Sequence, residues 1–140
     1  MNNPDSAEIR RVSDRWLLVA ALLGAAGVAL GAFGAHGLRT MLASATDGEQ
    51  RLAWWETGAR YHLLHALACA VAAWSIERSA GARAARLAAG AFVIGTSLFA
   101  GTLYAMALGA PHWLGAITPI GGVSLIAGWI ALAVSARRAS

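Results

Sequence analysis

The sequence is poor in charge and contains no lysine. Only 13% of its 140 residues are charged, against about 25% in a typical soluble domain. All eleven basic residues are arginines, which stand in short segments between long apolar runs. A nucleic-acid-binding protein needs a basic surface along which phosphates can lie. The pI of about 10.6 therefore does not indicate one, and we predict a membrane protein with no nucleic-acid partner.

Catalytic motifs are also absent from the sequence. It has no H-E-x-x-H, no G-x-S-x-G and no phosphate-binding glycine loop, the motifs of metalloproteases, serine hydrolases and nucleotide-binding enzymes. Ser44 and Asp47 do not stand at a recognisable hydrolytic spacing from the histidines. A membrane enzyme is thus the weakest hypothesis. The residues predict no catalytic site and no cofactor.

Three long uncharged runs predict the topology. They contain 23 residues between Arg15 and Arg39, 16 between Arg60 and Glu77, and 50 between Arg86 and Arg137. A 50-residue helix would be about 75 Å long, whereas a bilayer core is roughly 30 Å thick. The last run must therefore fold back once, and Pro111 marks the place.

We therefore predict an all-α polytopic membrane protein, a bundle of four transmembrane helices over residues 16–136. The expected spans are 16–38, 59–77, 87–109 and 113–136, with an N-terminal extension at 1–15 and a tail at 137–140. The second span is short, so we expect it to start earlier, within the segment WWETGARYH at 54–62. Glu56 and Arg60 stand four apart there and could pair on one helix face.

The arginines predict an orientation. With four spans, the two termini and the loop at 78–86 share one side, which carries eight arginines, while the other side carries three. The positive-inside rule then places both termini in the cytoplasm. The tryptophans fit two interfacial belts: Trp16, Trp74 and Trp129 toward the inner interface, and Trp54, Trp55 and Trp113 toward the outer one.

This threading places all four histidines in the outer third of the protein. His36 ends the first span, His62 and His65 begin the second, and His112 lies in the outer turn. Tyrosines and threonines accompany them, with Thr102 nearby. The candidate outer polar cluster is His36, Tyr61, His62, His65, Tyr104, His112 and Thr118.

Glycines and one proline are expected to shape the helices. Gly24, Gly27, Gly31 and Gly34 lie along one face of the first span, where a neighbouring backbone can approach closely. Pro119, followed by Gly121 and Gly122, breaks the fourth span. Either the helix kinks there, or a new helix begins with Thr118 as N-cap and Pro119 at its first position.

Four short segments of the sequence resemble those of a known family. GAFGAHGL at 31–38, YHLLHALA at 61–68, GTLY at 101–104 and GAITPIGG at 115–122 resemble the small four-helix membrane family called domain of unknown function 423, or UPF0382. The resemblance covers about residues 16–135 and leaves out the extension at 1–15. It implies the topology and a bacterial inner-membrane location. It carries over no catalytic residue, because the family has no established activity.

Three further hypotheses for function stand beside the enzyme. A metal site could use His36, His62, His65 and Cys69, whose imidazole and thiolate groups suit zinc or copper. An oligomeric transporter or channel for a small solute, ion or proton could use histidines as relays and the broken fourth helix as a binding site. The third is a non-catalytic component that binds membrane lipid, a partner membrane protein or further copies of itself. It explains every feature without an extra assumption and is the preferred prediction.

Overall fold

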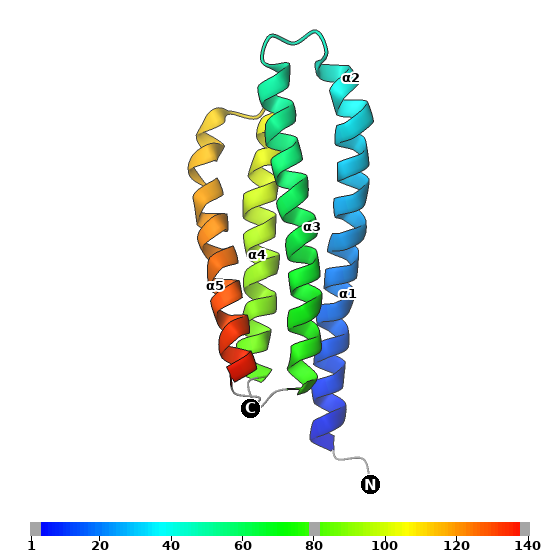
Figure 1. Ribbon diagram of the computed structural model, residues 1–140, viewed down its shortest axis with the longest axis vertical. Coiled ribbons are helices and arrows are strands. Elements are labelled where there is room, and N and C mark those ends of the chain that lie inside the picture. Colours follow the sequence, from blue (N-terminus) through cyan, green and yellow to red (C-terminus); the bar gives the residue numbers. More distant parts are fainter. Residues whose placement is uncertain (1–3, 79–81, 138–140) are drawn as a thin grey trace.

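The computed structural model describes residues 4–78 and 82–137, and the fold within these ranges is all-helical, as predicted. Its long helices lie side by side as rods (Figure 1), and the chain order gives four of them. The helical elements, in chain order, are α1 (Pro4–Phe33), a π-helical turn (Gly34–Leu38), α2 (Arg39–Leu42), α3 (Gly48–Arg78), α4 (Ala82–Ala107), a 3₁₀ helix (His112–Ala116) and α5 (Thr118–Arg137).

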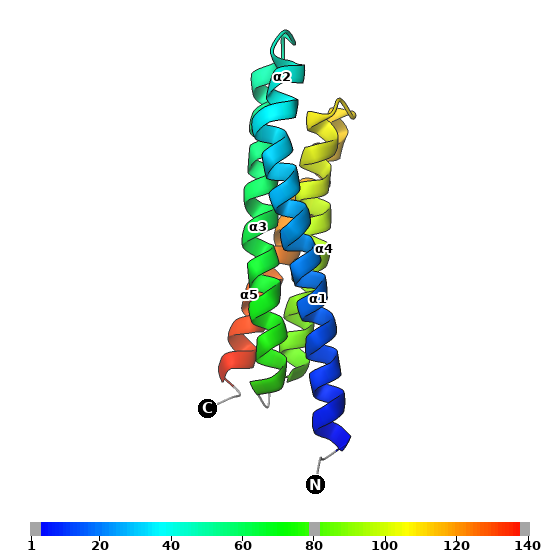
Figure 2. The same ribbon diagram turned by 90° about the vertical axis from the view of Figure 1, so that its right-hand side faces the viewer.

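Consecutive rods run antiparallel and pack in chain order. The start of α1, the end of α3, the start of α4 and the end of α5 lie at one end of the molecule (Figure 1). α1 packs against α3, α3 against α4, and α4 against α5, while α1 makes no comparable contact with α4 or α5. The four rods thus form a staggered row rather than a closed bundle, and Figure 2 shows α1 standing in front of the other three.

The first rod is longer than the predicted span. It is helical from Pro4, so residues 4–15 of the predicted extension belong to α1, where Ser13 is buried and donates a hydrogen bond to the Ala73 carbonyl of α3. At the other end the prediction that His36 ends the helix was wrong. The backbone passes through one π-helical turn and continues to Leu42.

The second rod, α3, begins before the predicted segment 54–62 and runs for 31 residues. Within the described ranges, three stretches are long and apolar enough to cross a membrane: Ser6–Leu42, Ala82–Ala107 and His112–Arg137. α3 is not among them, because polar and charged residues occupy its N-terminal half. The predicted pair of Glu56 with Arg60 does not form. Glu56 pairs instead with Arg39, at 3.2 Å.

The turn at Pro111 and the break at Pro119 were both placed correctly. Gly109 has a φ of +100°, a left-handed conformation that favours glycine, and the chain reverses there. Of the two options at Pro119, the structure has the new helix. It begins one residue earlier than predicted: the Ile117 carbonyl accepts the first N–H groups, so Ile117 and not Thr118 is the N-cap.

Small residues let the rods approach closely. The main core cluster is dominated by alanine (Ala20, Ala68, Ala72, Ala88 and Ala89) around Phe92, Cys69 and Leu125. A Cβ atom added at Gly121 would stand 2.5 Å from the backbone nitrogen of Phe99. Only glycine allows α5 to pack directly against the α4 backbone there. This is the packing expected where lipid supplies no hydrophobic driving force between helices.

Side-chain hydrogen bonds also join each neighbouring pair of rods. In four of these bonds a side chain donates to a backbone carbonyl of another helix. These bonds are Ser13 to Ala73 at 2.9 Å, Trp55 to Leu30 at 2.8 Å, Arg51 to Ala107 at 2.8 Å and Ser124 to Ala91 at 2.9 Å.

Candidate functional site

The centre of the molecule holds a histidine whose two ring nitrogens both have hydrogen-bond partners. His65 lies midway along α3 and is buried. Its Nδ1 lies 2.8 Å from the Tyr61 carbonyl, and the Trp129 Nε1–H donates to its Nε2 over 3.3 Å. Because the carbonyl can only accept and the indole can only donate, these two bonds assign the proton to Nδ1 and the lone pair to Nε2.

Aromatic rings surround His65 on three helices. Tyr61 lies stacked against it with ring centroids 5.7 Å apart, and Tyr61 in turn stacks on Phe99 of α4 at 4.4 Å. Phe92 lies at 5.8 Å, and its ring meets Trp129 of α5 edge-on at 5.3 Å. We call His62, His65 and these four aromatic residues, together with Tyr104, the histidine seam. It connects α3, α4 and α5.

His62 lies one turn away on the side of α3 that faces α1. Its Nδ1 is 3.4 Å from the Tyr104 hydroxyl of α4. The other edge of the ring approaches the α1 backbone near Gly27, where a Cβ atom would be 3.4 Å from the His62 ring. Within the described part of the chain, His62 Nε2 and Thr96 Oγ1 are buried without a hydrogen-bond partner of acceptable geometry. Thr96 was not among the predicted residues.

The predicted depths of these residues need correction. His65 was expected near the outer end and Trp129 near the inner interface, but the two side chains are hydrogen-bonded at mid-height of their helices. The four histidines therefore do not gather. The charge-free runs suggested helix starts that were too late, and α3 extends eleven residues beyond the predicted start of its span, which moves His62 and His65 toward its middle.

The remaining residues of the predicted cluster lie apart from the seam. His36 is exposed in the π-helical turn, where its carbonyl accepts the Thr40 hydroxyl. His112 is exposed at the start of the 3₁₀ helix, and its ring lies 5.2 Å from Trp54. Thr118 lies on α5, its hydroxyl 2.8 Å from that of Thr102 on α4.

The metal-ligand candidates are not brought together. In residues 4–78 and 82–137, no three side chains of His, Cys, Asp or Glu are arranged to hold a metal ion. Cys69 is fully buried in the alanine-rich core, with its thiol 3.9 Å from the Ala89 carbonyl. His36 is on the surface of a different helix. The side chains that would have to converge therefore point to separate surroundings.

The four glycines of the first span divide into two pairs. Cβ atoms added at Gly27 and Gly34 would collide with Leu63 and with the Trp55 ring of α3. Gly24 and Gly31 meet no atom of the described chain within 4 Å. In two packed helices, residues seven apart lie along the same line of the helix surface. Gly27 and Gly34 lie on the line that contacts α3, and Gly24 and Gly31 lie on a line beside it.

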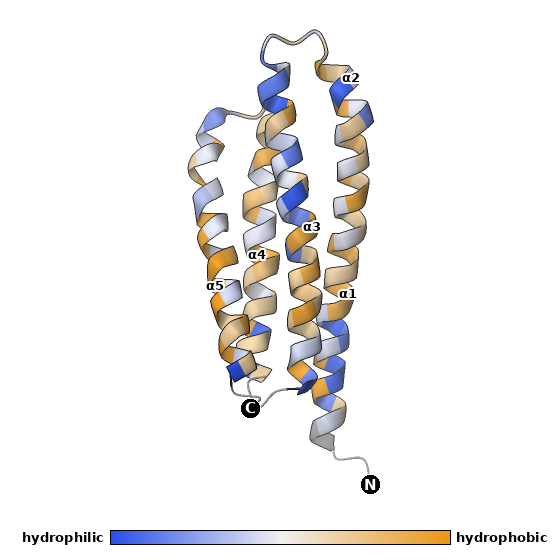
Figure 3. Cartoon of the chain, viewed as in Figure 1, coloured by the Kyte–Doolittle hydropathy of each residue, from blue (hydrophilic) through white to orange (hydrophobic). Residues whose placement is uncertain are grey.

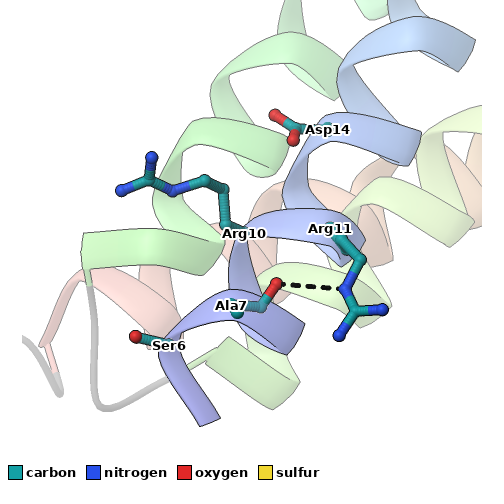
Figure 4. Close-up of a pocket in the computed structure, with 5 residues that line it drawn as sticks. All are labelled: Ser6, Ala7, Arg10, Arg11 and Asp14. Atoms are coloured by element: carbon teal, nitrogen blue, oxygen red, sulfur yellow. Dashed lines mark hydrogen bonds between the residues drawn. The ribbon is translucent and has the colours of Figure 1, made fainter. Parts of the chain in front are cut away.

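A surface hollow lies on the first turns of α1, lined by Ser6, Ala7, Arg10, Arg11 and Asp14. Figure 4 shows Arg10 and Arg11 pointing to different sides, with the Arg11 Nε–H bonded to the Ala7 carbonyl. All five residues come from one helix. Side chains do not converge there from different elements as they do in a binding pocket.

Sequence comparisons agree with this architecture. The family described as Protein of unknown function (DUF423) matches residues 30–122. The chain belongs to this family. Among its relatives is the UPF0382 membrane protein of Haemophilus influenzae, 40% identical over 122 residues that cover 87% of this chain and 93% of the relative.

Two further relatives cover similar lengths. The UPF0382 inner membrane protein YgdD of Escherichia coli K12 is 38% identical, over 91% of this chain and 93% of its own. The UPF0382 membrane protein YwdK of Bacillus subtilis is 36% identical, over 86% and 94%. No solved structure matches the chain. This DUF423 protein is therefore a membrane protein.

Sequence reasoning missed the aromatic half of the seam. Phe92, Phe99 and Trp129 stand in apolar runs where nothing distinguishes them from residues that face lipid. One signal was available: Phe92 and Phe99 are seven apart, as are Gly121 and Gly128. Gly128 receives the Phe92 ring, and Gly121 lies against the backbone of Phe99. Matching large and small residues at one spacing is typical of two helices that pack together.

Proposed function

We propose that this protein is a non-catalytic, four-span component of the bacterial inner membrane. In this proposal the histidine seam holds the helices together, and the exposed helix faces bind lipid or protein. The main support for this proposal comes from the hydrogen bonds of His65. Both ring nitrogens are already engaged, so a metal ion or a transferred proton would have to displace the bond from Trp129 or the bond to Tyr61.

Four spans are favoured over three by the alternation of the rods. α3 lies between α1 and α4 and runs antiparallel to both, over a comparable length (Figure 1). If α1 and α4 cross the membrane, the chain must return across it between them. Seven of the described arginines lie at the end that holds the start of α1 and the end of α5: Arg10, Arg11, Arg15, Arg78, Arg83, Arg86 and Arg137. The positive-inside rule makes that end cytoplasmic.

Native mass spectrometry tests the structural role of the seam. The protein is incubated with excess Zn²⁺ or Cu²⁺, desalted and released from mild detergent. We expect the mass of the bare or lipid-bound chain. A stoichiometric metal mass that is lost in His62→Ala and in His65→Ala would overturn the structural role, and His112→Ala is the matched control.

Reporter fusions test the topology separately. A fluorescent protein that folds only in the cytoplasm is fused after Ser140, and a phosphatase active only outside is inserted between Ala45 and Thr46. Both should be active, because the first follows α5, which ends at the arginine-rich end, and the second lies in the turn before α3 at the opposite end. Loss of activity at both sites, with activity in the exchanged fusions, would reverse the proposed orientation.

A further inference from the structure

One exposed face of α3 changes from polar to apolar along its length. Below the middle of the helix in Figure 1, toward its C-terminal end, this face presents Leu64, Leu67, Val71 and Trp74, all exposed. Above it, the same face presents small and charged side chains, which are also exposed. We call these upper residues the α3 polar strip: Ala53, Glu56, Thr57 and Arg60.

Arg60, at the end of the polar strip nearest the middle of α3, lies at a level where the first rod is apolar. Trp55 is bonded to the Leu30 carbonyl, and Leu63 packs on Gly27. Arg60 stands between these two contacts on α3 and is therefore level with residues 27–30 of α1. That segment is the middle of the 23-residue run without charge, and its Val28 is exposed.

The contacts between α3 and α4 place the polar strip at a similar depth. Gly58 of α3 packs against the Ala100 carbonyl and the Tyr104 ring, and α4 continues to Ala107. Seven residues of helix from Ala100 to Ala107 are about 10 Å long. Figure 3 shows hydrophilic residues extending further down α3 from this end than down α4 beside it. The lower part of the strip therefore lies within the apolar belt of its neighbours.

Charged side chains at such a depth are costly when they face acyl chains. Glu56 has one partner, Arg39, and both side chains are half exposed or more, at 50% and 62%. Arg60 is exposed and makes no ion pair with residues 4–78 or 82–137. The charged groups of the strip therefore lack part of their partners within one chain. A polar surface must cover it.

We propose that a second copy of this chain covers the α3 polar strip. About a twofold axis parallel to the helices, the two strips face one another, and each Glu56 meets the partner's Arg60. The two residues are four apart, so their levels differ by about 6 Å, which long side chains can bridge. Glu56 keeps acceptor capacity beyond its bond to Arg39. Ala53 and Thr57 form a small-xxx-small pair that permits close approach.

The mixed charge of the strip favours a second copy over a phospholipid. A lipid phosphate would satisfy Arg60 but repel the Glu56 carboxylate one turn away. In the dimer each Glu56 instead has the partner's Arg60 one helical turn away, within reach of the two long side chains, so both charges obtain an opposite charge. This inference deepens and rests on the proposed function, because it names the protein that the exposed face of α3 binds.

Cysteine cross-linking in native membranes tests the inference. Thr57→Cys places a thiol at the centre of the strip, and Leu22→Cys is the matched control, because Leu22 is exposed on α1 away from it. Cys69 is buried and stays in place. Mild oxidation should give a disulfide-linked dimer for Thr57→Cys and none for Leu22→Cys or the parent chain. The absence of a Thr57→Cys dimer overturns the inference.

Charge variants in the Thr57→Cys background test the ion pairs. Arg60→Glu sets carboxylates against one another and should lower the dimer yield about thirty-fold or more, the cost of breaking a desolvated charge pair. Arg60→Lys should retain the dimer. Arg39→Gln removes the partner within the chain and should also retain it. Membrane levels and melting temperatures establish that each variant is folded.

The experiments distinguish a failure of the dimer from a failure of the proposed function. A correctly oriented membrane protein that stays monomeric overturns the dimer and leaves the proposed function intact. A monomer that carries a phospholipid mass, lost in Arg60→Gln, shows that lipid covers the strip and overturns the second copy. Labelling of Thr57→Cys by a membrane-impermeant maleimide, with no dimer, shows that water covers it and also overturns the inference.

Discussion

The first and second rods of the molecule, α1 and α3, are opposites in composition and in position. α1 is strongly apolar, contacts one helix extensively and exposes most of its surface. α3 is too polar to qualify as a span by hydropathy, yet it lies at the centre of the row and carries both seam histidines. In a soluble protein the more apolar helix would be the more buried one. Here the relation is reversed, as expected when the solvent is lipid.

The difference shows which interactions stabilise each of the two rods. α1 needs little from its neighbours, because lipid solvates its apolar side chains and the helix satisfies its own backbone. α3 depends on its neighbours for partners: the Trp129 indole for His65, the Tyr104 hydroxyl near His62 and the Leu30 carbonyl for Trp55. Perturbation along α3 and its contact lines should therefore cost more than perturbation of the open surface of α1.

The largest effect should come from the line where α1 meets α3. Gly34→Ala places a methyl group against the Trp55 ring, which must move and lose its bond to the Leu30 carbonyl. Overpacking and the lost hydrogen bond together should lower the free energy of unfolding by about 3 kcal/mol. Chemical unfolding in mixed micelles, followed by circular dichroism, measures this.

Gly31→Ala is the matched control, because it makes the same change three residues earlier on α1. A Cβ atom at Gly31 meets nothing within 4 Å among the described residues. Alanine is the better helix former, so the change should be neutral or stabilising by up to about 1 kcal/mol. Equal destabilisation by the two variants would contradict the division of the glycines into packed and open pairs.

A smaller effect is expected within the seam. His65→Ala removes both ring hydrogen bonds, leaves the Trp129 N–H without its acceptor and opens a space beside Phe92. The free energy of unfolding should fall by about 2 kcal/mol. The exposed His112 contacts Trp54 alone among the aromatic rings, so His112→Ala should cost less than about 0.5 kcal/mol. Similar melting temperatures for the two variants in detergent would contradict the central position of His65.

The helical class and the turn at Pro111 were predictable, because they follow from local features. A 50-residue run without charge exceeds any single crossing, and Pro111 stands where the chain reverses. Pro119 similarly marks the start of α5, since proline lacks the N–H that a continuing helix would need. The family was recognisable from the same short motifs and is confirmed by the match to residues 30–122.

Helix ends and depths were less predictable, for a physical reason. Charge marks where a chain leaves lipid but does not end a helix, so the first rod continues through α2 past Arg39, and α3 begins before Arg51. The π-helical turn at His36 also has no local sequence signal. It stands in the segment where Gly34 admits the Trp55 ring, a contact between residues 21 apart in the chain.

The sequence by itself determined that this protein is helical, that it belongs in a membrane and that the chain reverses at Pro111. Those properties depend on charge-free length and on single prolines, which act locally. The tertiary structure alone decided that His65 binds Trp129, that Gly27 and Gly34 pack while Gly24 and Gly31 stay open, and that Glu56 turns to Arg39 and not to Arg60. Each of these depends on the stagger between antiparallel rods, which is set by side chains on both helices at once.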